Sequence, residues 1–227
     1  MNPLLTRLLL AVGGAIIGSL SYPQPGIAVL MFVGLPMMVF AFRGASFRGG
    51  VLLGFVVGFA YYGSVARWLT IYLGVVPWAG LVAMEAVLFA VGGVLLVAAW
   101  RGTTHLNLHS LRGILLAGVL VAAAWTTREA IAAQWPWGGF AWARVSQSQA
   151  DTPLRYLATL FGMSGASAVL VFACVIVVLL VQWGGTRRVL IQRVTIVVAA
   201  LAALLPLPYL LLASAPSGSF RVAAVQG

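Results

Sequence analysis

Residues 78–100 read WAGLVAMEAVLFAVGGVLLVAAW, a run in which one acid, Glu85, interrupts apolar residues and glycines. A helix of about 20 apolar residues is long enough to cross the hydrocarbon core of a bilayer. The run therefore predicts a transmembrane helix. Because an unpaired carboxylate is expensive in lipid, Glu85 is expected to face the interior of a helix bundle or a cavity, in either a substrate-binding or a structural role.

The rest of the chain has the same character. Hydrophobic residues make up 63% of the sequence and charged residues 7%, whereas a soluble domain carries roughly 25% charged residues. Too few polar side chains are present to coat a water-soluble globule. The sequence predicts an all-α polytopic membrane helix bundle over residues 1–213, with about seven spans. The predicted spans are residues 4–20, 27–42, 51–73, 78–100, 114–133, 156–183 and 194–213.

Two short patterns describe how the spans meet. The segment SYPQPG, residues 21–26, predicts a tight turn that joins the first two spans into a helical hairpin. In the third span Gly54 and Gly58 stand four residues apart, a spacing that lets helix backbones approach closely. Chance in a glycine-rich chain would also produce that spacing.

Arginine supplies every basic charge, and the formal net charge is +10. The arginines fall mostly in loops between apolar runs, so we assign them to topology and to anionic headgroups, and predict no nucleic-acid partner. The more basic set of loops contains the N-terminus, which is therefore expected in the cytoplasm, with the C-terminus outside. The more basic side holds Arg7, Arg43, Arg48, Arg101, Arg112, Arg187, Arg188 and Arg193, and the other side holds Arg67, Arg128, Arg144, Arg155 and Arg221.

Residues 134–155 form a polar, aromatic-rich segment between two apolar runs, which we call the polar loop. Its aromatic side chains are of the kind that sits at a membrane interface, and an aromatic belt would explain them. Clustering beside glycines and hydrogen-bonding side chains favours a groove for an acyl chain and a polar headgroup instead. The candidate substrate-binding residues are Trp135, Trp137, Phe140, Trp142, Ser148 and Gln149, together with Glu85.

For the two remaining acidic residues, the sequence predicts structural roles. Glu129 follows Arg128 at the outer end of the fifth span, which predicts an interfacial ion pair. Asp151, two residues before Pro153, is typical of the N-cap of the sixth helix.

No catalytic residue is predicted within the chain. Cys174 lies in an apolar run, where a thiol is inert and serves packing. His105 and His109 have a helical metal-binding spacing but no accompanying carboxylate or thiolate, so we predict a solvated loop and neither a metal nor a cofactor.

The segment FAWARVSQSQADTPL, residues 140–154, resembles the loop F-P-W-x-x-x-x-x-S-Q-x-D-x-P-L of apolipoprotein N-acyltransferases. Ala141 stands where the family has proline. The turn SYPQPG and the segment YLGVVPW, residues 72–78, also fit. The matching residues of the loop are Phe140, Trp142, Ser148, Gln149, Asp151, Pro153 and Leu154.

The resemblance implies an enzyme of the bacterial cytoplasmic (inner) membrane. Members of this family move an acyl chain from a phospholipid onto a Cys nucleophile, assisted by a Glu and a Lys, in an extracytoplasmic nitrilase-like αββα domain. They then pass it to the diacylglyceryl-modified cysteine of an apolipoprotein. The implied partners are therefore a phospholipid acyl donor, the modified apolipoprotein and the membrane. No residue of this chain matches the triad, and lysine is absent from the sequence.

Residues 214–227, SAPSGSFRVAAVQG, are expected to be a linker followed by a short strand. The strand resembles the first strand of the nitrilase-like domain, so the chain is expected to be the membrane portion of the enzyme, truncated and inactive alone. A different hypothesis is a non-enzymatic membrane scaffold, for example for a polyprenyl-phosphate mannosyl synthase. A transporter would require an inverted repeat and more intramembrane polar residues.

Overall fold

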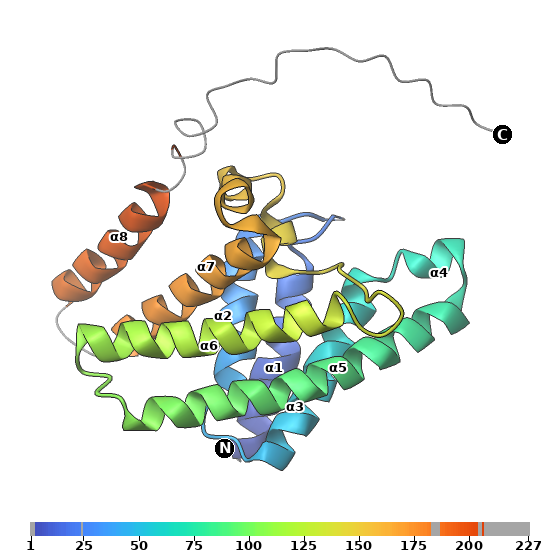
Figure 1. Ribbon diagram of the computed structural model, residues 1–227, viewed down its shortest axis with the longest axis horizontal. Helices are drawn as coiled ribbons and strands as arrows, with labels where there is room; N and C mark the ends of the chain where they lie inside the picture. The colour runs from blue at the N-terminus through green and yellow to red at the C-terminus, as the bar shows by residue number, and fades with distance from the viewer. Residues whose placement is uncertain (1–2, 24, 183–186, 204–205, 207–227) are drawn as a thin grey trace, which may run out of the picture.

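The computed structural model describes residues 3–23, 25–182, 187–203 and 206, and all of its regular elements are helices (Figure 1). It confirms the predicted all-α bundle. The α-helices are α1 (Pro3–Ser19), α2 (Met31–Ala41), α3 (Phe47–Val65), α4 (Leu69–Tyr72), α5 (Val75–Gly102), α6 (Leu111–Ala132), α7 (Tyr156–Gln182) and α8 (Arg187–Ala203). The 3-10 helices are η1 (Ala28–Leu30), η2 (Thr103–His105), η3 (Val145–Gln149) and η4 (Pro153–Arg155).

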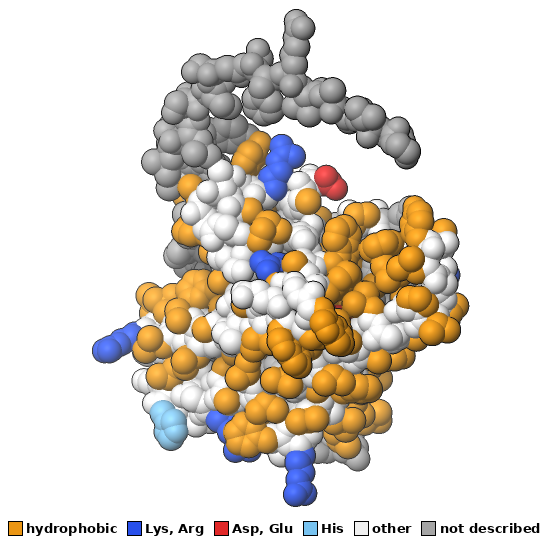
Figure 2. All heavy atoms as spheres, turned by 45° about the vertical axis from the view of Figure 1, so that its right-hand side comes forward, with side chains coloured by type: hydrophobic (Ala, Val, Ile, Leu, Met, Phe, Trp, Pro, Cys, Tyr) orange, Lys and Arg blue, Asp and Glu red, His pale blue; other side chains and the backbone are white. Residues whose placement is uncertain are grey.

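Four of the helical segments are long and apolar enough to cross a membrane: Phe47–Val65, Val75–His105, Leu111–Ala132 and Pro153–Gln182. The first two predicted spans correspond to shorter apolar helices, Leu4–Ser19 and Ala28–Ala41. Hydrophobic side chains cover most of the visible face, and charged ones are few (Figure 2). This surface suits lipid.

The third predicted span, residues 51–73, was wrong at both ends. Helix α3 begins earlier because the Ser46 hydroxyl caps it by accepting a hydrogen bond from the Gly49 amide at 3.0 Å. It ends at Val65, and the chain then turns and forms the one-turn helix α4. Residues 66–76, which we call the α4 arm, lie at one edge of the molecule (Figure 1).

The seventh predicted span, residues 194–213, begins inside α8, and its second half lies mostly outside the described residues. The predicted linker and strand at residues 214–227 also lie outside them. Helix α7 was predicted as one continuous span, but its backbone breaks at Gly162, which has φ 67° and ψ 175°. These torsion angles are open to glycine and rare for other residues.

Close helix packing depends on glycine where helices cross. A Cβ on Gly54 would lie 2.5 Å from the Phe89 carbonyl oxygen, and one on Gly58 would lie 2.7 Å from the Ala86 Cα. The small-residue spacing in the third span is therefore used, against α5. The hairpin of α1 and α2 is closed in the same way, because a Cβ on Gly34 would meet the Gly18 amide nitrogen at 2.4 Å.

Candidate functional site

The polar loop connects α6 to α7 and crosses one end of the bundle, which we call the loop end. Trp137 and Ala143 take positive φ values of 51° and 64°, unusual for residues with side chains. Gly139, at φ 73°, passes so close to the end of α6 that a Cβ there would lie 2.2 Å from the Ala133 carbonyl carbon. The loop thus has a specific, tightly packed backbone.

The predicted aromatic residues lie mostly on the outside of this loop. The exposed fractions are 94% for Trp137, 63% for Trp135 and 43% for Trp142, while Phe140 is partly buried against the core. Large exposed indoles give the loop end an amphipathic surface, with apolar rings beside backbone polar groups.

The predicted polar residues lie on the inside. Ser148 and Gln149 are 4% and 1% exposed. The Ser148 hydroxyl donates to the Val145 carbonyl at 2.7 Å, and the Gln149 amide donates to the Ala28 carbonyl at 3.1 Å. Both side chains therefore bind the loop to itself and to η1, instead of facing a ligand.

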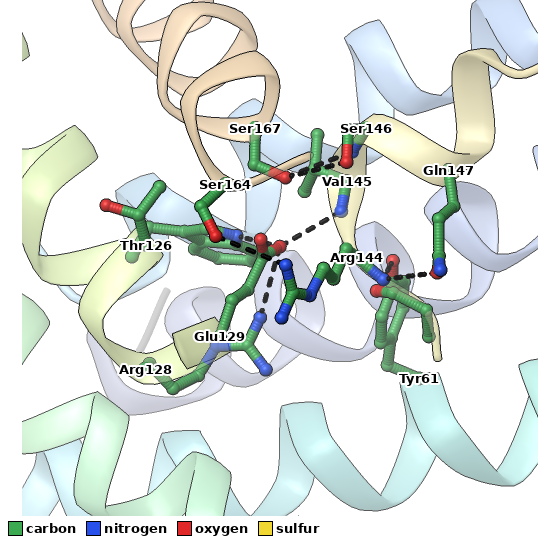
Figure 3. Close-up of polar contacts among 12 residues, drawn as sticks. Tyr61, Thr126, Arg128, Glu129, Arg144, Val145, Ser146, Gln147, Ser164 and Ser167 are labelled. Atoms are coloured by element: carbon green, nitrogen blue, oxygen red, sulfur yellow. Dashed lines mark hydrogen bonds and ion pairs between the residues drawn. The ribbon is translucent and has the colours of Figure 1, made fainter. Parts of the chain in front are cut away.

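Glu129 is the main attachment point of the loop to the bundle (Figure 3). Its Oε1 accepts hydrogen bonds from the Val145 amide and from the Trp125 indole nitrogen, each at 2.9 Å. The same oxygen lies 3.5 Å from Nη2 of Arg128. The predicted ion pair is present, and both of its residues are buried within the bundle, each only 2% exposed. Charged groups this deep need partners, and the loop backbone supplies one of them.

Two buried tyrosines hold the backbone of the polar loop by hydrogen bonds. The Tyr22 hydroxyl donates to the Arg144 carbonyl at 2.8 Å, and the Tyr61 hydroxyl donates to the Ala143 carbonyl at 3.1 Å. Burial and the neighbouring Tyr61 raise the pKa of Tyr22 well above its usual value, so its phenol stays protonated and remains a donor. On the far side of the loop, the Ser146 amide donates to the Ser167 hydroxyl of α7 at 3.1 Å (Figure 3).

Glu85 lies apart from the loop surface, inside the bundle, and is fully buried. Arg128 and Tyr62 are the groups that act on it electrostatically. Arg128 reaches this region across α5, where Gly92 makes room for its stem, and its guanidinium lies 4.2 Å from the Phe89 ring centre. Both carboxylate oxygens of Glu85 have no hydrogen-bond partner in the described part of the chain. With Arg128 and Tyr62 nearby, this carboxyl group lies in a partly polar environment inside the bundle.

Asp151 does not cap a helix. The cap is its neighbour Thr152, whose hydroxyl accepts from the Leu154 amide at 3.2 Å, while Pro153 takes the first helical position as expected. Asp151 is exposed, and the cap lies one residue later than predicted because Thr152 has the extended backbone that an N-cap requires.

The α4 arm adds a feature that the sequence did not indicate. Trp68 contacts Trp142 of the loop and Tyr72 of the arm, each with ring centres 6.1 Å apart and edge-to-face. Around these rings Ile71 is 80% exposed and Val76 is 82% exposed. In the sequence, these residues merge with the apolar spans on either side, so no pattern set them apart.

The loop end presents an amphipathic surface, and its acidic side chains do not cluster as metal ligands would. Within the described ranges, no cluster of three or more His, Cys, Asp or Glu side chains could hold a metal ion. Cys174 is buried in α7 among apolar residues. The geometry therefore supports binding and orientation of a ligand, with rigid backbone beneath exposed aromatic rings.

Comparison with known proteins gives two matches. The model of the family described as apolipoprotein N-acyltransferase N-terminal domain matches residues 14–176. The apolipoprotein N-acyltransferase of Methylococcus capsulatus is 29% identical over 188 residues, which make up 80% of this chain and 36% of that protein. The chain thus spans about a third of the length of this curated relative. The matched range covers the loop end, from the Tyr22 turn to the first part of α7.

Proposed function

Since the chain belongs to the family of apolipoprotein N-acyltransferase N-terminal domains, we propose that it is the membrane part of such an enzyme. The enzyme would transfer an acyl chain from a phospholipid to the N-terminal diacylglyceryl-cysteine of lipoproteins. The role of this chain is to receive both lipid substrates at the loop end and to orient them. We place the loop end on the extracytoplasmic side of the bacterial cytoplasmic membrane, with the N-terminus in the cytoplasm.

The division of the polar loop into two faces carries this proposal. Its inner face is bound by Glu129, Tyr22, Tyr61 and Ser167, so the backbone keeps one shape. Its outer face presents Trp142 against Trp68 of the α4 arm. A preorganised apolar surface binds a flexible acyl chain at less entropic cost than a mobile one. Ser148 and Gln149 then hold the surface in place, and the exposed tryptophans contact the substrate.

The chemical step is assigned to a nitrilase-like domain that follows the membrane part. Acyl transfer through a thioester requires a thiolate that attacks the phospholipid ester carbonyl, with the lysophospholipid alkoxide leaving, and an oxyanion-stabilising group beside it. Cys174 does not meet this requirement, because it is 6% exposed within α7 and has only apolar neighbours in the core.

The 227-residue chain alone is therefore expected to form no acyl-enzyme. The measurement is intact-mass spectrometry after incubation with phospholipid in detergent, with hydroxylamine treatment to release any thioester. An added acyl mass on Cys174 that hydroxylamine removes would place the nucleophile in this chain and refute the division of labour.

Trp142→Ala in the complete gene product is expected to lower the rate of lipoprotein N-acylation at limiting phospholipid by about tenfold. Losing the contact of an aromatic ring of this size with the substrate removes roughly 1–3 kcal/mol of binding free energy. The rate would be measured by mass spectrometry of a lipoprotein N-terminal peptide. The matched control is Phe59→Ala, which removes a half-exposed aromatic ring from the outside of α3. If both variants and the native enzyme acylate the lipoprotein at the same rate, Trp142 does not contact the substrate, and the loop serves only as a membrane anchor.

A further inference from the structure

A hollow of about 550 Å³ lies beside the α4 arm. It is walled by residues of α1, the turn after α1, the end of α3 and the arm itself. The apolar part of the wall is formed by Ile16, Leu20, Val65, Trp68 and Ile71, and the cation is Arg67. Its size falls within the range of small-molecule sites, roughly 300–1,000 Å³.

The guanidinium of Arg67 supplies the hydrogen-bond donors of the hollow that can bind a ligand. Its side chain is exposed, and its guanidinium has no ion pair or hydrogen bond with the described part of the chain. The three hydroxyls in the wall are already engaged as donors. Ser64 donates to the Ala60 carbonyl and Thr70 to the Arg67 carbonyl, each at 2.8 Å, and Ser19 donates to the Ile16 carbonyl at 2.7 Å. A guanidinium in this position suits an acceptor-only anion, and a phosphodiester matches its planar array of N–H groups.

Two residues of the apolar wall are also exposed on the outer surface of the bundle. Ile16 is 47% exposed and Leu20 is 38% exposed, and both belong to the outer surface of the first apolar helix and its end. An occupant can therefore enter sideways from the bilayer with its acyl chain against these residues. Arg67 follows α3 closely, just beyond its last residue Val65 and its C-cap Ala66, and charged residues at the end of a spanning helix are expected near the lipid headgroups.

We propose that this hollow binds one glycerophospholipid, with the phosphodiester on the Arg67 guanidinium and an acyl chain along Ile16, Leu20 and Ile71. Trp68 forms the partition between the hollow and the loop, since it lines the hollow and also contacts Trp142. The hollow is thus a waiting site from which a phospholipid passes under Trp68 to the proposed acyl-transfer surface. That role as a donor site rests on the proposed function, whereas the binding itself does not.

The test is a lipid-binding measurement on the complete protein in detergent by native mass spectrometry, using phosphatidylglycerol as the probe. Arg67→Gln is expected to weaken binding about tenfold or more, the loss of one charge-assisted contact. Arg112→Gln is the matched control, because it removes an equally exposed arginine at the start of α6, outside the hollow. Ser64→Phe keeps the charge but fills the hollow, and it is expected to weaken binding to a similar extent.

Two competing probes identify the ligand class. Diacylglycerol, which has the same chains without the phosphate, is expected to bind at least tenfold more weakly, and inorganic phosphate at millimolar concentration is expected not to displace the lipid. Equal binding of diacylglycerol, displacement by inorganic phosphate, or unchanged binding in either Arg67→Gln or Ser64→Phe would each overturn the proposal.

The same variants separate this inference from the proposed function. If Arg67→Gln loses phospholipid binding while Trp142→Ala leaves acyl transfer intact, the phospholipid site in the hollow is supported and the proposed substrate surface of the polar loop is refuted. If Trp142→Ala slows acyl transfer while Arg67→Gln binds phospholipid normally, the loop proposal stands and the hollow is refuted.

Discussion

Glu129→Ala is expected to release the polar loop and to destabilise the bundle by about 3–5 kcal/mol, the typical cost of removing one partner from a buried ion pair. The Arg128 guanidinium would lose its counter-charge, and two N–H donors, on Val145 and Trp125, would lose their acceptor. Each donor left without an acceptor further lowers the stability of the bundle, because little water reaches this site. Arg128 and Glu129 are each only 2% exposed.

Thermal unfolding in detergent would give the stability change, and limited trypsin digestion would report on the loop. Arg144 lies in the loop with its backbone carbonyl bound by Tyr22, so cleavage after Arg144 requires release. Asp151→Ala is the matched control, since it removes an exposed loop acid that makes no helix cap. A Glu129→Ala protein with native thermal stability and no new cleavage at Arg144 would contradict the assignment of Glu129 as the attachment point.

Gly93→Leu is expected to prevent the packing of α3 on α5 and to abolish the folded, monodisperse protein. A Cβ on Gly93 would lie 2.1 Å from the Gly50 carbonyl oxygen, and backbone atoms cannot rotate away as a side chain can. Overpacking in a core costs roughly 1–3 kcal/mol where side chains can adjust, and more is expected here. Leucine is itself a better helix former than glycine, which is about 0.8–1.0 kcal/mol less favourable than alanine, so any loss of stability must come from the contact.

The control for this change lies on the same helix. A Cβ on Gly80 of α5 would meet nothing within 4 Å, and Gly80→Leu is therefore expected to leave the protein folded or slightly more stable. Size-exclusion chromatography and thermal unfolding of the two variants decide the point. Similar behaviour of Gly93→Leu and Gly80→Leu would show that the α3–α5 contact is looser than the structure indicates.

Hydrophobic pattern and helix signals predicted the parts of the fold that depend on local sequence. The span at residues 78–100 lies within α5, and the span at 114–133 matches α6 to within a few residues, because apolar length alone determines these helices in lipid. The end of α3 was missed for the opposite reason. Residues 66–68, Ala-Arg-Trp, contain neither proline nor glycine, and the chain turns there to pack the α4 arm, which is a tertiary effect.

The candidate site, too, could be predicted only in part from the sequence. The aromatic residues of the polar loop stand out in the sequence, and three of them lie on its exposed face. The polar residues Ser148 and Gln149 were predicted to face substrate, but hydrogen-bonding capacity does not reveal whether the partner is a ligand or the chain itself. Tyr22 and Tyr61 were not selected at all, since a tyrosine near or within an apolar run is common and only their distant partners, Arg144 and Ala143, give them a role.

The buried charges of α6 also constrain how the protein is made. Arg128 and Glu129 are adjacent near the end of a helix that must enter the membrane, where charged side chains are unfavourable. The partners of Arg128 on other helices, Tyr62 on α3 and Phe89 on α5, lie earlier in the chain. During synthesis these helices leave the ribosome first. Helix α6 therefore reaches a bilayer in which its docking site already exists, and the order of the helices along the chain is also an order of assembly.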